Sequence, residues 1–283
     1  MIQQQPSARP TRHLVGAWLV AILTSASLAA TATPGHAQSQ ALRRNAGKPC
    51  GTLTTGEAEL VRFTSDNSHG EPAVIEGILM RPDGDGPFPA VVMLHTARGM
   101  APPGCYGETQ RLFRDWGYAS LLVDSASAGV EGGGRSFAPS VRDVAADAEH
   151  AAAYLASLPA IDPTRLAVIG WSRGAMATLR VLTARRPGPQ PFRAGVAYYP
   201  TCPPRIEVLA APVILFHGDA DTIASIDSCR STEVVAPDAP AFTLVEYPGR
   251  QHRFDRLGDE NYHAGDAADT FRRVRAFLRR HLE

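Results

Sequence analysis

The sequence has no excess of either charge. It carries 28 basic and 28 acidic residues among 283, with no long block of like charge. Recognition of nucleic-acid phosphates needs clustered lysine and arginine, so the charge pattern gives no reason to expect a nucleic-acid partner. With 44% hydrophobic and 20% charged residues, the composition is that of an ordinary folded chain, which excludes a disordered or collagen-like protein.

Long hydrophobic runs are also rare, and the sequence contains only one near membrane length. It extends from Leu14 to about Ala30, after Arg9 and Arg12 and before the small residues of Gly35-His36-Ala37. This pattern predicts a signal peptide over residues 1–37, cleaved near Ala37, and hence a periplasmic or secreted protein with no stable membrane span. The alternative is an uncleaved anchor, because the run is only slightly shorter than a spanning helix.

Cysteine is scarce, and no cysteine stands in a Cys-x-x-Cys pair, nor is there a His-x-x-x-His pair, so we expect no metal site. An even number of cysteines in an exported chain favours disulfides. We favour Cys202 with Cys229, because both follow neighbouring predicted strands at one sheet edge. That leaves Cys50 paired with Cys105, or both free. The chain has only these four cysteines.

After a polar, flexible segment at residues 38–57, the chain alternates strand-like apolar runs with helical patterns. This alternation predicts an α/β fold for residues 58–283: one domain with a mainly parallel central sheet, helices on both faces and an N-terminal antiparallel hairpin. No repeat or linker divides it. Strands are expected at 60–63, 74–80, 90–94, 119–123, 166–169, 194–199, 213–216 and 242–247, and helices at 108–116, 141–158, 175–182, 228–235 and 267–282.

The most informative stretch is Gly170-Trp171-Ser172-Arg173-Gly174. An apolar strand precedes it and a helical pattern follows, which is the context of a nucleophile elbow. The glycines permit the tight turn that exposes the Ser172 hydroxyl. The N–H of Arg173 would lie at the helix N-terminus, where backbone donors favour an anionic oxygen. One short segment therefore offers a nucleophile and half of an oxyanion hole.

A serine nucleophile needs a base and an acid that orients the base. In α/β-hydrolase folds these follow in the order serine, acid, histidine. Asp221 follows the strand at 213–216 and His252 follows the strand at 242–247, so both fall at the edge of the sheet that carries Ser172. Asp219 is a rival acid. The second oxyanion donor is expected from the backbone N–H of Thr96 or Ala97, after the strand at 90–94.

These motifs together resemble the dienelactone hydrolase family over roughly residues 58–283. The Tyr-Pro-Gly-x-x-His-x-Phe block is the most specific of them. The resemblance implies a single-domain α/β-hydrolase that needs no metal or cofactor, with the catalytic triad on Ser172, Asp221 and His252. The matching blocks are His95-Thr96-Ala97-Arg98-Gly99, Gly170-Trp171-Ser172-Arg173-Gly174, His217-Gly218-Asp219-Ala220-Asp221 and Tyr247 to Phe254.

The chain departs from that family at two positions. The best-known members carry cysteine where this chain has Ser172, and a glutamate where it has Thr96. The family also has an arginine four residues after the triad histidine that binds the substrate carboxylate, and Arg256 stands there; the alternative is a solvated surface arginine.

The sequence thus predicts an exported serine hydrolase that cleaves small-molecule carboxylic esters or lactones through an acyl-enzyme on Ser172. One alternative is a peptidase or amidase of the prolyl-oligopeptidase-like type. Another is a hydrolase-fold protein that binds a ligand without turnover. The oligomeric state is not predicted.

Overall fold

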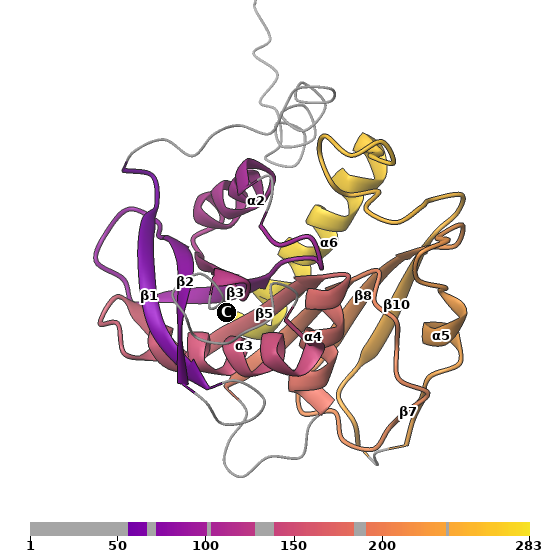
Figure 1. Ribbon diagram of the computed structural model, residues 1–283, viewed down its shortest axis with the longest axis horizontal. Coiled ribbons are helices and arrows are strands. Elements are labelled where there is room, and N and C mark those ends of the chain that lie inside the picture. The colour runs from indigo at the N-terminus through magenta and orange to yellow at the C-terminus, as the bar shows by residue number, and fades with distance from the viewer. Residues whose placement is uncertain (1–55, 67–71, 101–102, 128–138, 184–190, 236–237) are drawn as a thin grey trace, which may run out of the picture.

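An eight-stranded sheet crosses the whole molecule (Figure 1). The structure is a computed structural model that describes residues 56–66, 72–100, 103–127, 139–183, 191–235 and 238–283. The strand order is β1-β2-β4-β3-β5-β6-β8-β10. The strands are β1 (Glu59–Asp66), β2 (Pro72–Met80), β3 (Phe88–Leu94), β4 (Ala119–Asp124), β5 (Ile161–Trp171), β6 (Phe192–Tyr198), β8 (Val213–Gly218) and β10 (Phe242–Tyr247).

Six neighbouring strands, from β4 to β10, are parallel, as the alternation of strands and helices predicts. β1 and β2 form the predicted antiparallel hairpin, with Phe63 opposite Ile75, and β2 joins β4 antiparallel. Parallel strands end at the same sheet edge, so the segments that follow β3, β5, β8 and β10 meet there. The fold itself therefore brings the predicted site residues to one edge.

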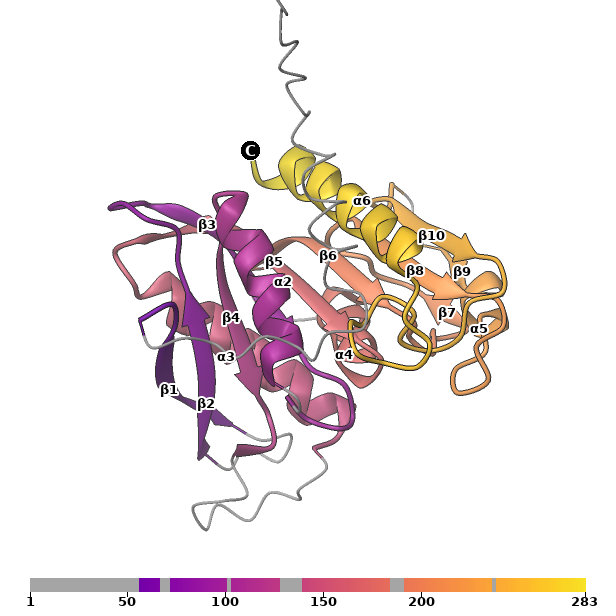
Figure 2. The same ribbon diagram turned by 90° about the horizontal axis from the view of Figure 1, so that it is seen from above.

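Helices cover both faces of the sheet (Figure 2). Alternation along β3 shows the two layers, because Val92 and Leu94 belong to one buried cluster and Val91 and Met93 to the other. The first cluster is completed by α3 and α4, and the second by α2 and α6. These helices are α2 (Pro103–Asp115), α3 (Val141–Ala156), α4 (Arg173–Thr183) and α6 (Ala264–Leu282).

The helix predicted at 228–235 is wrong in most of its length. Only α5 (Asp227–Arg230) is helical, and β9 (Glu233–Val234) pairs with β7 (Arg205–Ile206) in a separate two-stranded sheet. The N–H of Glu233 donates to the carbonyl of Pro204, and that of Val235 to Ile206. A single helical turn gains little by itself, and β-branched residues suit the extended pairing, so the partner segment decides the conformation.

Some other helices and strands begin several residues away from the positions predicted from the sequence. β5 begins at Ile161 rather than Leu166, and α6 begins at Ala264 because the Nδ1 of His263 accepts the N–H of Asp266. No helix within the described ranges is both long and apolar enough to cross a bilayer. The predicted signal peptide at 1–37 and most of the segment at 38–57 lie outside those ranges.

Candidate active site

Ser172 lies on the turn between β5 and α4, with a left-handed backbone φ of 54°. Its N–H donates to the carbonyl of Tyr198 at 2.9 Å. A Cβ on Gly170 would lie 2.1 Å from the carbonyl oxygen of Gly174, and a Cβ on Gly174 would lie 2.2 Å from that of Leu94. Only glycine fits either position. The predicted strand, sharp turn and helix are confirmed, and the turn leaves the hydroxyl within reach of His252.

Ser172, His252 and Asp221 lie in contact at the sheet edge. His252 Nε2 is 3.0 Å from Ser172 Oγ, and His252 Nδ1 is 2.7 Å from Asp221 Oδ2. The histidine is 4% exposed and the aspartate 9%. An ionised carboxylate only accepts hydrogen bonds, so Nδ1 donates to Asp221 and Nε2 is left to accept the proton of the serine hydroxyl.

Asp221 is held as the ionised form. Its Oδ1 accepts the N–H groups of Ile223 at 2.8 Å and Ala224 at 3.0 Å. Burial raises the pKa of the Asp221 carboxyl, but the hydrogen bonds from His252 and from these two N–H groups outweigh it, so the pKa is lowered from its ordinary value. Asp219 is exposed and instead accepts the N–H of Gly249 at 2.6 Å. The structure thus brings Asp221, not Asp219, to His252.

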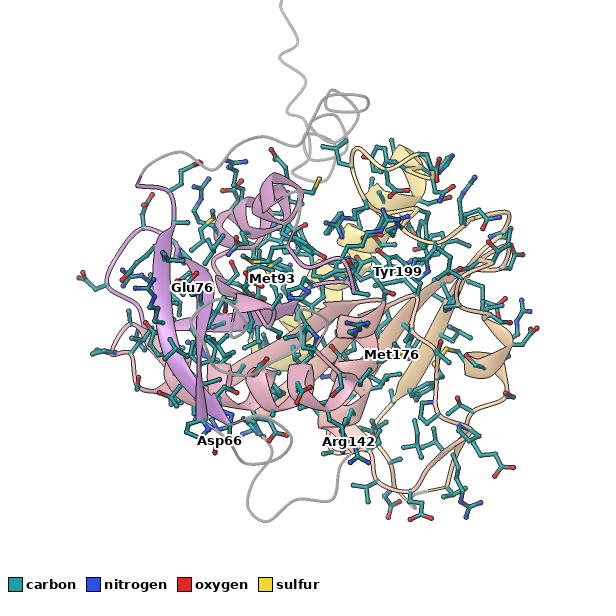
Figure 3. The ribbon with its side chains drawn as sticks, viewed as in Figure 1. Asp66, Glu76, Met93, Arg142, Met176 and Tyr199 are labelled. Atoms are coloured by element: carbon teal, nitrogen blue, oxygen red, sulfur yellow. A yellow bond between two sulfur atoms is a disulfide. The ribbon has the colours of Figure 1, made fainter. Side chains whose placement is uncertain are left out.

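Tyr199 supports His252 from the other side and was not foreseen from the sequence. Tyr199, which is labelled in Figure 3, directly follows β6 and has a left-handed φ of 44°. Its ring centroid is 4.4 Å from that of His252. Burial raises the pKa of the Tyr199 hydroxyl well above its ordinary value, so the side chain stays neutral. A bulky residue with positive φ beside Ser172 and His252 marks backbone strain at the same edge.

The three predicted oxyanion donors lie on two segments. Arg173 is the first residue of α4, so its N–H has no partner within the helix. On the loop after β3, the N–H of Thr96 donates to the hydroxyl of Tyr106 at 3.0 Å. Within the described ranges the N–H of Ala97 has no hydrogen-bond partner. The N–H of Ala97, rather than that of Thr96, is therefore free to bind an oxyanion. The contact of Tyr106 with this loop was not predicted from the sequence.

A hollow of about 120 Å³ opens beside the serine. Its wall combines the loop after β3 with the loops that carry Asp221 and His252. Arg253, one of its basic residues, has a left-handed φ of 66° and pairs with Asp259 at 3.1 Å. The residues that line the hollow are Thr96, Ala97, Arg98, Ser172, Ile223, His252 and Arg253.

Arg256 does not line this hollow. Its Nη1 donates to the hydroxyl of Tyr106 at 2.8 Å, and its guanidinium lies 4.2 Å above the centre of the tyrosine ring. It lines a separate cavity together with Tyr106 and Trp171. Its role as a binder of substrate carboxylate stays a prediction, and the alternative of a solvated surface arginine is wrong because the side chain is enclosed by these contacts.

A disulfide joins Cys202 to Cys229, the pairing favoured from the sequence, and Asp221 lies in the loop of chain that it closes. The N–H of Cys202 also donates to the hydroxyl of Ser228 at 3.1 Å. Cys105 is disulfide-bonded too; Cys50 lies outside the described residues, so its pairing with Cys105 stays a prediction. Among the described residues, no group of three or more histidine, cysteine, aspartate or glutamate side chains could hold a metal ion.

The parallel sheet, its helix layers and the chain order of serine, aspartate and histidine are those of an α/β-hydrolase. The model of the dienelactone hydrolase family matches residues 75–282, and the chain belongs to that family.

The chain is similar to an esterase in sequence and to several solved structures in fold. Esterase FrsA of Escherichia fergusonii is 30% identical over 150 residues, which is 53% of this chain and 34% of the esterase. The matching part thus spans about a third of that relative's length. An esterase of Pyrococcus furiosus shares the fold with a TM-score of 0.59 at 17% identity, covering 83% of this chain and 98% of that one. A puromycin-hydrolyzing peptidase of Mycobacterium tuberculosis shares it with a TM-score of 0.59 at 18% identity, covering 82% and 41%.

Proposed function

We propose that this protein is a serine hydrolase that cleaves carboxylic ester or lactone bonds of small molecules through an acyl-enzyme on Ser172. The observation that carries the proposal is the unbroken contact from Asp221 through His252 to the hydroxyl of Ser172, on a turn with strained φ. Membership of the dienelactone hydrolase family and the likeness to esterases support it.

In the first half of the reaction, Ser172 Oγ attacks the substrate carbonyl carbon while His252 Nε2 takes the hydroxyl proton. Asp221 holds the imidazole in the productive tautomer and stabilises its charged form. The carbonyl oxygen becomes an oxyanion, which the N–H groups of Ala97 and Arg173 would hold. His252 then gives the proton to the leaving alkoxide, and the C–O bond breaks to leave the acyl group on Ser172.

In the second half, water attacks the acyl carbonyl while His252 Nε2 takes its proton. The tetrahedral intermediate collapses, the proton returns to Ser172 Oγ, and the carboxylic acid leaves. Losing one oxyanion donor typically costs ~3 kcal/mol of transition-state stabilisation. The donors proposed here are backbone groups, so side-chain deletion at Ala97 or Arg173 does not remove them.

The small hollow favours a short acyl group. At about 120 Å³ its described part is well below the roughly 300–1,000 Å³ of sites that enclose drug-sized ligands. Ala97 and Ile223 give it an apolar wall next to Ser172. We therefore expect acetyl and butyryl esters to be hydrolysed better than esters of long fatty acids.

The test is hydrolysis of p-nitrophenyl acetate and butyrate by the wild type and by Ser172→Ala. Ser157→Ala is the matched control, because Ser157 is an exposed serine at the end of α3. The proposal predicts that Ser172→Ala abolishes measurable turnover and that Ser157→Ala retains it. Undiminished turnover in Ser172→Ala would contradict the proposal.

The same assay separates the alternatives. A p-nitroanilide with the same acyl group replaces the ester by an amide, and preferential cleavage of the amide would favour a peptidase or amidase. No turnover of any substrate by a folded wild type, together with ligand binding, would favour a non-catalytic hydrolase-fold protein. A panel of lactones with and without a carboxylate would then narrow the substrate class.

We also propose that the protein is exported to the periplasm or the medium. The N-terminal pattern of residues 1–37 supports this, and so does the disulfide between Cys202 and Cys229, since disulfides persist in oxidising compartments. Fractionation of expressing cells with N-terminal sequencing tests it. A mature chain that begins at Gln38 is expected, whereas an intact N-terminus in the membrane fraction would indicate an anchor.

A further inference from the structure

A single hydroxyl group joins the loop after β3 to the loop after His252. The hydroxyl oxygen of Tyr106, on α2, accepts the N–H of Thr96 at 3.0 Å and Nη1 of Arg256 at 2.8 Å. Tyr106 is 3% exposed. Arg256 is 150 positions further along the chain. The contact is therefore tertiary, and both loops belong to the proposed active site.

The contact fixes the peptide next to Ala97. The N–H of Thr96 is held by Tyr106, and its carbonyl accepts the N–H of Gly99 at 3.1 Å. Its side-chain oxygen accepts the N–H of Arg98 at 3.3 Å. With Thr96 held at three points, the following N–H, that of Ala97, has a set direction beside Ser172 while remaining without a partner in the described ranges.

The same network reaches the nucleophile turn. Asp255 Oδ2 accepts Nε1–H of Trp171 at 2.8 Å, and Trp171 directly precedes Ser172. The ring of Trp171 also packs edge-on against Tyr106, with centroids 5.4 Å apart. Asp255 adjoins Arg256 in the chain and interacts with its charge. The two segments that carry the expected oxyanion donors are thus fastened to one buried cluster.

The protonation states of Tyr106 and Arg256 favour the hydrogen bond between them. Burial raises the pKa of the Tyr106 hydroxyl, so it stays neutral and its oxygen can accept two hydrogen bonds. Burial lowers the pKa of Arg256, but Tyr106, Tyr199 and Asp255 outweigh it and raise the pKa, so the guanidinium stays charged. A hydrogen bond from a charged donor is stronger than one between neutral groups.

We propose that Tyr106 and Arg256 are positioning residues that hold the Ala97 N–H in the oxyanion hole, and that Arg256 acts in this way rather than by binding a substrate carboxylate. This inference rests on the proposed function. Arg256 Nη1 donates to Tyr106, and the arginine lies outside the hollow at Ser172. Its Nη2 is buried with no hydrogen-bond partner among the described residues, and Arg256 lines the neighbouring cavity, so the second test below decides between the two roles. Neither residue touches the reacting atoms, so both act through the loop after β3.

The first test is Tyr106→Phe, which keeps the ring against Trp171 and Arg256 and removes only the hydroxyl. Because a displaced donor weakens transition-state binding alone, we expect kcat for p-nitrophenyl acetate to fall roughly 10- to 100-fold. KM should change little, whereas Tm should fall by several degrees, because the Thr96 N–H and the Arg256 guanidinium both lose their acceptor. The matched control is Tyr262→Phe. Tyr262 lines the neighbouring cavity, and its hydroxyl has no hydrogen-bond partner among the described residues, so kcat should be retained.

A transition-state analogue separates positioning from a merely structural effect. A trifluoromethyl ketone forms a tetrahedral adduct with the serine, and its oxyanion needs the same N–H donors. In Tyr106→Phe the inhibition constant should rise by the same factor by which kcat/KM falls. An unchanged inhibition constant, or an unchanged kcat, would overturn the inference.

The second test is Arg256→Gln, assayed on a neutral ester and on an ester with a free carboxylate, such as mono-p-nitrophenyl glutarate. Positioning predicts that kcat falls by the same factor on both. A loss confined to KM for the charged ester would overturn the inference and assign Arg256 to substrate binding. Failure of the proposed function is distinct, since the wild type would then show no turnover that depends on Ser172.

Discussion

His252 Nε2 lies 3.0 Å from Ser172 Oγ, although the two residues are 80 positions apart in the chain. Their contact exists because β5 and β10 end at the same edge of a parallel sheet, with β6 and β8 between them. The turn at Ser172 and the packing of Tyr199 on His252 then set the two side chains. Because the strands and turns of the sheet set this geometry, single substitutions of the three catalytic side chains should change activity more than folding.

Replacing Asp221 by asparagine should lower kcat by about 10⁴-fold, because an amide favours the wrong imidazole tautomer. The matched control is Asp219→Asn, since Asp219 is two residues away and accepts the N–H of Gly249 instead of contacting His252. Ester hydrolysis by both variants measures the difference. An equal loss in the two variants, or a greater loss in Asp219→Asn, would refute the assignment of Asp221.

The lowered pKa of Asp221 predicts a pH dependence of stability. Its pKa in the fold lies below the ordinary value of 3.8, so the fold prefers the ionised form. The resulting stabilisation is complete above that ordinary value and is lost as the pH falls through the lower pKa of the folded protein. Urea unfolding of wild type and Asp221→Asn should show a difference in free energy that is constant above about pH 5 and shrinks as the pH falls from about 5 to about 2. A constant difference would contradict this.

Gly170→Ala and Gly174→Ala should each lower the free energy of unfolding by about 1–3 kcal/mol or more. An added Cβ would lie 2.1 Å from a backbone carbonyl oxygen at Gly170 and 2.2 Å from one at Gly174. Gly265→Ala is the control, because the nearest atom would be 3.5 Å away, in the first turn of α6. Alanine there should be neutral or stabilise by up to about 1 kcal/mol. Urea unfolding that shows no cost at either elbow glycine would rule out the described turn.

The disulfide between Cys202 and Cys229 should stabilise the fold by restricting the unfolded chain. It closes a loop with a sequence separation of 27, for which chain entropy gives roughly 3.5 kcal/mol. We expect Cys202→Ala/Cys229→Ala to lose about this amount in urea unfolding, and reductant to have no further effect at this pair. Equal stability of the oxidised wild type and the double variant would show that the bond contributes nothing.

The central strands and the site at their ends could be predicted because their signals are local. The apolar runs at 213–216 and 242–247 form the parallel strands β8, which is buried, and β10, which is the partly exposed edge strand. The order of strands places Asp221 and His252 beside Ser172. Asp219 and Asp221 could not be fully separated by sequence. Their difference depends on which one reaches His252 from a loop that Ile223 and Ala224 shape.

The features that could not be predicted from the sequence depend on contacts between residues that are far apart in the chain. The sequence pattern of residues 228–235 predicts a helix, but β9 pairs with the backbone of β7 and is therefore extended. The disulfide between Cys202 and Cys229 also joins these two parts of the chain. Tyr106 precedes the helix predicted at 108–116, and its role is visible only in the structure, where α2 includes it and it packs against Trp171. The N–H of Thr96 was an equal candidate with Ala97 until Tyr106 was found to occupy it.

Covalent labelling shows directly whether Ser172 is the nucleophile that His252 activates. The protein is treated with a fluorophosphonate and digested, and the modified peptide is identified by mass spectrometry. We expect one adduct, on Ser172, that forms in the wild type and is largely lost in His252→Ala, because the hydroxyl then has no base. An adduct on another residue, or equal labelling of Ser172 in His252→Ala, would contradict this assignment.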